Sequence, residues 1–147
     1  MTDGRAYVAW LDSQESVDTS RMIGTTGYCM TGSYVIRLAA AIPSRIGAGG
    51  SFHGGGLATD RADSPHLLAG QISAGFLIAI AENDDERNPE EKELLRQAFD
   101  ANDVEAEIEV YDGTLHGWCP PDSSVYHEEQ AERAWSRMLA LFERRLS

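Results

Sequence analysis

The run Phe-Leu-Ile-Ala-Ile-Ala at residues 76–81 is the part of the sequence that most limits the possible folds. Consecutive apolar residues leave no polar face, which is typical of a strand buried on both sides in a parallel sheet. Further strands are expected at residues 22–27, 46–52 and 106–111, the last with an alternation that suits a sheet edge. The pattern therefore favours a parallel sheet.

Helical patterns fill the intervals between these strands. They cover residues 4–13, 33–42, 89–102 and 126–146, and a Pro-initiated turn is expected at 64–70. The last helix carries one apolar stripe that we expect to pack on the core: Trp135, Met138, Leu139, Phe142 and Leu146. Alternating helices and strands predict an α/β fold with about four parallel strands and flanking helices, in a single domain over residues 1–147.

Charge and composition exclude some classes of function. The 147 residues carry a formal net charge of -12, spread along the chain, which argues against nucleic acid or an anionic membrane as the main partner. No apolar run approaches the length of a membrane span, and no signal peptide is recognisable, so we expect a cytoplasmic protein. The two cysteines, Cys29 and Cys119, are too few for a disulfide framework.

Reactive side chains follow each of the expected strands. They are, in chain order, Cys29, His53, the pair Asp84 and Asp85, and His116. Because the carboxyl ends of parallel strands meet at one edge of a sheet, we expect these side chains to lie close together. The order nucleophile, acid, histidine is that of the α/β-hydrolase triad.

The segment Gly-Tyr-Cys-Met-Thr-Gly around Cys29 joins a strand to a helix through small residues. A sharp turn there would expose the thiol, and the following helix N-terminus would favour its thiolate form. A histidine can then take the proton while a carboxylate orients that histidine.

Five ordered motifs make the comparison specific: "GTTGYCMTG", "SFHGGGL", "SPHLL", "IAENDDERNP" and "VYDGTLHGW". Together they resemble the dienelactone hydrolase family (carboxymethylenebutenolidases) of the α/β-hydrolase superfamily. The resemblance implies a hydrolase that opens small ester or lactone substrates through a Cys–Asp–His triad and an acyl-enzyme, without a cofactor. By the same resemblance Cys29 is the nucleophile, His116 the base, Asp84 the acid with Asp85 as the alternative, and the Met30 N–H an oxyanion donor.

Two departures from the family pattern qualify this expectation. The family usually has glycine two residues after the nucleophile; here Thr31 stands there, and a β-branched side chain can strain or tilt the turn. The strands that precede the nucleophile strand in α/β-hydrolases are missing, so the chain resembles only the C-terminal portion of the family. The nucleophile strand would then leave one sheet edge bare, which invites self-association. The alternative function is therefore an impaired, truncated homologue that acts as a binding or pairing module.

Other interpretations of single residues remain. Cys29 could be an ordinary buried thiol, or a redox sensor together with Cys119. His53 and His66 lack a carboxylate or cysteine at ligand spacing, so no metal site is expected. The glycines after His53 are expected to form only a flexible loop.

Overall fold

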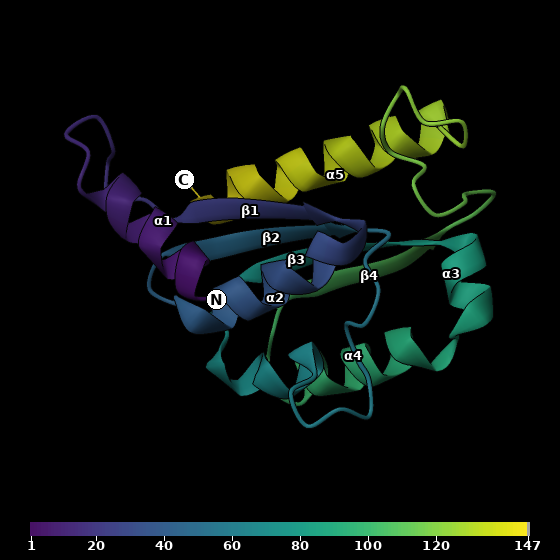
Figure 1. The fold of residues 1–147 in the computed structure, drawn as a ribbon, viewed down its shortest axis with the longest axis horizontal. Coiled ribbons are helices and arrows are strands. Elements are labelled where there is room, and N and C mark those ends of the chain that lie inside the picture. The colour runs from purple at the N-terminus through teal and green to yellow at the C-terminus, as the bar shows by residue number, and fades with distance from the viewer. Residues whose placement is uncertain (147) are drawn as a thin grey trace.

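The sheet contains four parallel strands in the computed structural model, which describes residues 1–146. The strands are β1 (Ile23–Tyr28), β2 (Ile46–Phe52), β3 (Gly75–Ala81) and β4 (Ala106–Tyr111). Their spatial order is β1-β2-β3-β4, and every neighbouring pair is parallel (Figure 1). The expected α/β architecture with about four parallel strands is confirmed.

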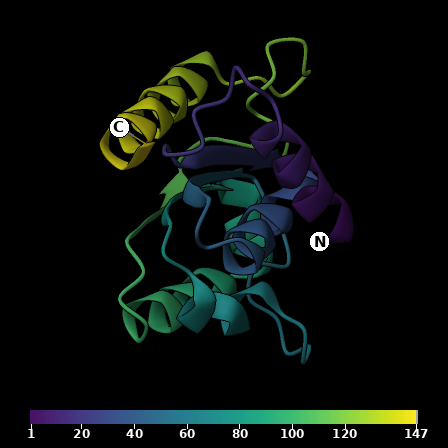
Figure 2. The same ribbon diagram turned by 90° about the vertical axis from the view of Figure 1, so that its left-hand side faces the viewer.

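Helices cover both faces of this sheet. They are α1 (Thr2–Asp12), η1 (Cys29–Thr31), α2 (Gly32–Ala41), η2 (Pro65–Gln71), α3 (Glu82–Arg87), α4 (Glu90–Asp100) and α5 (Glu128–Leu146). Figures 1 and 2 show α5 on one face, and α2, η2 and α4 on the other. Among the described residues, no helix is both long and apolar enough to cross a membrane.

The position of β3 between two helical layers explains why its sequence is apolar throughout. Phe76 and Ile78 belong to the core under α2 and α4, whereas Leu77 and Ala79 belong to the core under α5, and all four are nearly inaccessible to solvent. Successive side chains point to opposite faces, so a strand between two helical layers needs an apolar residue at every position.

Small residues in β2 allow α2 to lie close to the sheet. A Cβ atom on Gly49 would lie 2.5 Å from Val35 of α2 and 2.8 Å from Phe76 of β3. Such distances are shorter than real Cβ contacts, so a larger residue would push the helix away from the sheet.

The helices differ from the sequence-based expectations in two details. The charged segment after β3, for which no helix was predicted, forms helix α3, whose first turn carries the carboxylates of Glu82, Asp84 and Asp85. Negative charge near a helix N-terminus is favourable, which explains why so acidic a segment is helical. On α5, Trp135 and Leu139 of the expected core stripe are 49% and 48% exposed.

The buried stripe of α5 instead centres on Met138. Ala134, Met138 and Leu141 are buried against β2 and β3, and Phe142 and Leu146 pack beside them. A single helix over a narrow sheet buries a stripe of limited width, so apolar residues on its flank stay in solvent.

Candidate active site

Cys29 stands on a strained turn at the carboxyl end of β1. Its φ angle is 53°, in the left-handed region that residues other than glycine seldom adopt, and its side chain is exposed to solvent. The hydroxyl of Thr31 closes this turn: it accepts the N–H of Tyr28 at 2.9 Å and donates to the carbonyl of the same residue at 2.8 Å. The turn therefore holds the thiol in a solvent-exposed position.

Thr31 does not strain the elbow as its β-branched side chain suggested. Its own backbone has φ -82° and ψ -8°, ordinary helical values. The close approach falls to Gly32, where a Cβ atom would lie 2.5 Å from Ser51 Oγ and 2.6 Å from Gly54 Cα. The glycine that packs α2 against the end of β2 thus lies one residue later than the family pattern places it.

His116 lies in the loop after β4, between two glycines with positive φ angles, Gly113 at 74° and Gly117 at 94°. Two successive residues at the start of α3 fix this loop by hydrogen bonds to its backbone. The Glu82 carboxylate accepts the Gly113 N–H at 3.0 Å, and the Asn83 side chain accepts the His116 N–H at 2.8 Å. The loop carrying His116 is thereby fastened to the segment that carries Asp84.

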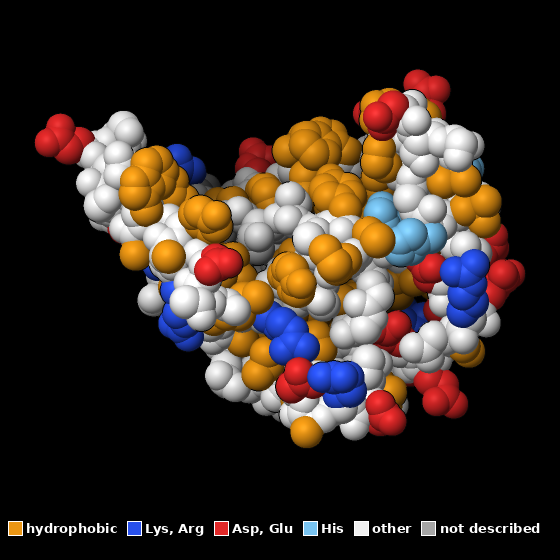
Figure 3. Space-filling view, viewed as in Figure 1, with side chains coloured by type: hydrophobic (Ala, Val, Ile, Leu, Met, Phe, Trp, Pro, Cys, Tyr) orange, Lys and Arg blue, Asp and Glu red, His pale blue; other side chains and the backbone are white. Residues whose placement is uncertain are grey.

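The structure brings Cys29, His116 and Asp84 into one hydrogen-bonded line. His116 Nε2 lies 3.0 Å from Cys29 Sγ, and His116 Nδ1 lies 2.6 Å from Asp84 Oδ2. Figure 3 shows histidine surface, in pale blue, near the carboxyl end of β1, so this edge of the sheet is open to solvent. The three residues come from three different strand ends, as the parallel topology requires.

The titration behaviour follows from these contacts. The hydrogen bond from His116, with a further one from the Met30 N–H, lowers the pKa of the Cys29 thiol. Burial lowers the pKa of His116, but its hydrogen bonds to Cys29 and Asp84 outweigh this, and its pKa lies above the usual value. Both shifts favour a thiolate beside an imidazolium.

Asp85 lies apart from this line. Its two carboxylate oxygens bind the Lys92 ammonium at 2.6 and 2.7 Å, and both side chains are only 20% exposed. Asp85 therefore ties α3 to α4. Of the two adjacent carboxylates, Asp84 contacts His116.

The remaining candidates have separate surroundings. His66 Nδ1 lies 2.8 Å from Ser64 Oγ. Cys119 is a free, half-buried thiol, and burial raises its pKa to about 12. Within residues 1–146, no three His, Cys, Asp or Glu side chains gather in a way that could hold a metal ion. His53 is buried beside His116 rather than part of a mobile loop, although Gly55 and Gly56 beyond it have open space around them.

The sequence model of the dienelactone hydrolase family matches residues 1–146. The chain belongs to the dienelactone hydrolase family. Its relatives include a carboxymethylenebutenolidase from Rhodococcus opacus, 27% identical over 90% of this chain and 54% of the relative. A protein of Synechocystis sp. named "Putative carboxymethylenebutenolidase" is 28% identical over 99% of this chain and 59% of the relative.

Solved structures agree with the family assignment. The crystal structure of a Klebsiella pneumoniae protein named "Putative Dienelactone Hydrolase" superposes with a TM-score of 0.81 at 28% identity, covering 95% of this chain and 58% of that one. The chain therefore spans somewhat more than half the length of the dienelactone hydrolases that it matches, and it has the α/β-hydrolase fold in part.

Sequence patterns did not reveal the residues that hold the site together. Glu82 and Asn83 were part of the quoted motif, but only the helical start of α3 aims them at the loop that carries His116. The sequence indicated that Thr31 can strain or tilt the turn, whereas its hydroxyl caps the elbow. Its place three residues after Tyr28 is the usual spacing of a side-chain cap and could have indicated this role.

Proposed function

We propose that this member of the dienelactone hydrolase family cleaves carboxylic ester or lactone bonds of small molecules, with Cys29 as the nucleophile. The observation that carries the proposal is the line Cys29 Sγ, His116 and Asp84, with distances of 3.0 and 2.6 Å. A thiol, an imidazole and a carboxylate in this order supply a nucleophile, a proton carrier and an orienting charge.

The reaction would run in two steps. The Cys29 thiolate attacks the carbonyl carbon and forms a C–S bond, and the Met30 N–H stabilises the negative oxygen. His116 then gives its proton to the leaving oxygen as the C–O bond breaks, which leaves an acyl-enzyme. A water molecule next attacks the acyl carbon and gives a proton to His116; the C–S bond breaks and the acid leaves.

Asp84 orients His116 in both steps. Its contact at His116 Nδ1 fixes the tautomer in which Nε2 faces the thiol, and it stabilises the imidazolium form. The raised pKa of His116 and the lowered pKa of Cys29 support this assignment.

The test is hydrolysis of p-nitrophenyl acetate and of an enol-lactone by the wild-type chain and by Cys29→Ala and Cys119→Ala. We expect Cys29→Ala to abolish turnover and Cys119→Ala to retain it. Mass spectrometry of a rapidly quenched reaction should find the acetyl group on the peptide that contains Cys29. Turnover that survives Cys29→Ala unchanged would contradict the proposal.

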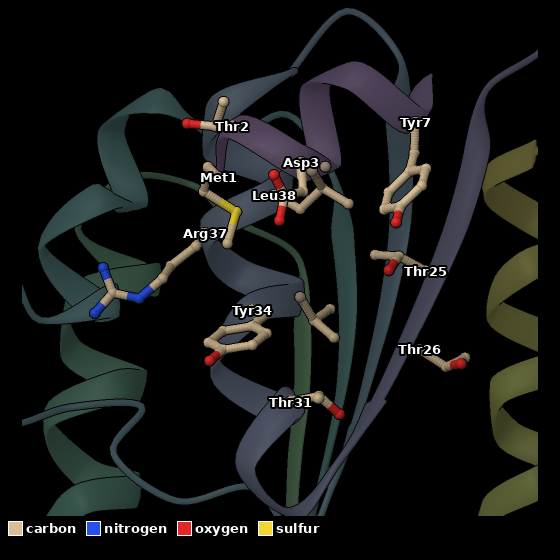
Figure 4. A pocket seen from close by; sticks show the side chains of 12 residues that line it. Met1, Thr2, Asp3, Tyr7, Thr25, Thr26, Thr31, Tyr34, Arg37 and Leu38 are labelled. Carbon is tan, nitrogen blue, oxygen red and sulfur yellow. The ribbon is translucent and has the colours of Figure 1, made fainter. Parts of the chain in front are cut away.

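A second candidate function, self-association, is favoured by the edge of the sheet at β1. Within residues 1–146 this strand pairs only with β2, so no strand of that range lies beside its outer N–H and C=O groups. Next to it lies a hollow of about 800 Å³, bounded by α1, β1 and α2. Figure 4 shows Tyr7, Thr25 and Tyr34 around this hollow.

Exposed apolar residues continue around the hollow. Among its lining residues, Tyr7 is 70%, Tyr34 46% and Met1 43% exposed, and Figure 3 shows hydrophobic surface spread over this side of the molecule. Two copies could pair through β1, as unprotected edge strands do. Analytical ultracentrifugation over a range of concentrations tests this: a dimer that Thr26→Pro disrupts supports it, and a monomer at every concentration counts against it.

A further inference from the structure

His53 occupies the end of β2, between the strand ends that carry Cys29 and Asp84. The preceding residue, Phe52, pairs with Tyr28 on one side and Ala79 on the other. The His53 N–H donates to the carbonyl of Ala79 at 2.8 Å. The side chain is therefore placed in the middle of the candidate active site.

The backbone of His53 is strained, since its φ angle is 39°. This region is unfavourable for a residue with a Cβ atom, whereas glycine adopts it freely. Three glycines follow immediately, but the residue at the strained position itself is a histidine. A large ring is nevertheless held at this position, only 3% exposed.

The ring of His53 packs among aromatic neighbours. Its centroid lies 4.9 Å from that of His116, at an interplanar angle of 64°. Tyr28 and Trp118 lie farther away, at 6.0 and 6.5 Å between ring centroids. Neither Nδ1 nor Nε2 has a hydrogen-bond partner among residues 1–146, so the contact with His116 is one of packing.

His116 needs such a contact. Its two hydrogen bonds, to Asp84 and Cys29, lie on opposite sides of the ring and do not stop the ring from tilting about the line between them. The flanking Gly113 and Gly117 give the loop little stiffness of its own. A rigid, buried ring in contact with His116 would restrict this tilt.

We propose that His53 is a positioning residue that fixes the ring plane of His116 between Cys29 and Asp84. This inference rests on the proposed function of the triad. It follows that an uncharged aromatic ring should serve at position 53, and that a residue without a ring should not.

The charge state of His53 supports this role. Burial, together with the positive charge of His116, lowers the pKa of His53 to about 4, against weaker opposite effects from its own backbone and from Asp84. His53 is therefore neutral at neutral pH. A neutral neighbour allows His116 to become an imidazolium, whereas a cation at this distance would oppose it.

The experiment compares His53→Ala, His53→Gly and His53→Phe with the wild-type chain. The first readout is the pH dependence of Cys29 alkylation by iodoacetamide, in a Cys119→Ala background, because it reports the His116 contact without any ester turnover. The second readout is kcat and KM for p-nitrophenyl acetate. Thermal unfolding followed by circular dichroism shows which variants are folded.

We expect His53→Ala and His53→Gly to shift the alkylation profile of Cys29 to higher pH and to lower kcat by about tenfold, with KM little changed. His53→Phe should resemble the wild type in both readouts. Wild-type profiles in His53→Ala and His53→Gly would overturn the proposal, as would a His53→Phe variant that is folded but behaves like His53→Ala. If no variant or wild-type chain hydrolyses the ester, the proposed function fails, and the alkylation profiles alone decide the role of His53.

Discussion

His116 Nε2 and Cys29 Sγ lie 3.0 Å apart although 87 residues separate them in the chain. Parallel strands bring the two residues together, because β1 and β4 both end at the same edge of the sheet. The contact makes the reactivity of the thiol depend on the imidazole.

The first prediction concerns the pH at which Cys29 reacts. A free thiol ionises near pH 8.5, but the hydrogen bond from His116 lowers the pKa of Cys29, so alkylation should remain fast at lower pH. His116→Ala should move the midpoint of alkylation upward. The rate of iodoacetamide labelling against pH measures this, and an unchanged midpoint would exclude the contact in solution.

The choice between the two adjacent carboxylates gives the second prediction. Asp84→Asn should lower ester hydrolysis by about 10²-fold or more, because His116 loses the charge that stabilises its imidazolium. Asp85→Asn should leave hydrolysis nearly unchanged and cost about 1 kcal/mol of stability, because it weakens the ion pair with Lys92. Steady-state rates and urea unfolding separate the two, and the reverse ranking of rates would assign the acid to Asp85.

Thr31 provides the third prediction. Thr31→Val keeps the shape but removes both hydrogen bonds to Tyr28, so we expect a loss of about 1 kcal/mol in the free energy of unfolding. Thr31→Ser retains the hydroxyl and is the matched control. Urea denaturation of both variants provides the comparison, and equal stabilities would show that the hydroxyl does not hold the elbow.

Gly32 gives the fourth prediction. In Gly32→Ala the new Cβ would press on the buried side chain of Ser51 and on the backbone of Gly54, neither of which can easily move aside. We therefore expect a destabilisation of about 1–3 kcal/mol. At Gly55 no atom of residues 1–146 outside this glycine and its two chain neighbours lies within 4 Å of the corresponding Cβ position, and Gly55→Ala is the control. Thermal melts should separate the two variants clearly, and similar melting temperatures would argue against a tight joint at Gly32.

The fifth prediction is acid instability caused by His53. Its pKa is about 4 when folded and near 6.5 when unfolded, so between these values the unfolded chain binds a proton that the folded chain excludes. Stability should therefore fall as pH drops from 6.5 to 4, by about 3 kcal/mol in total from this group. In His53→Phe the stability should fall less over this pH range, because phenylalanine binds no proton. Urea unfolding at a series of pH values measures the slope, and equal slopes in both proteins would contradict the prediction.

Much of the architecture follows from local patterns in the sequence. The apolar run of β3 requires a strand buried on both faces, and the alternation of strands and helices gives a parallel sheet. Once the topology is parallel, residues that follow the strands must share one edge. The meeting of Cys29, Asp84 and His116 was predictable for that reason.

The structure differs from the sequence-based expectations where the outcome depends on how an element is placed and rotated in the fold, and not on the periodicity of its apolar residues. The segment Glu82–Arg87 has no apolar period that marks a helix, and its helical form depends on its position after β3. On α5, Trp135 and Leu139 were expected to be buried but are exposed. Sequence spacing gives the width of an apolar face but not how the helix is rotated on its sheet.

The sequence by itself determined the order of the elements, the family, and the identity of the side chains at the carboxyl edge of the sheet. Only the tertiary structure placed Asp84, and not Asp85, in contact with His116, since successive residues of α3 point in directions about 100° apart. It also decided that Thr31 caps the elbow, that Gly32 makes the close contact, and that His53 is buried against His116. These outcomes depend on how separate elements are oriented in space, and the linear sequence carries no local signal for that.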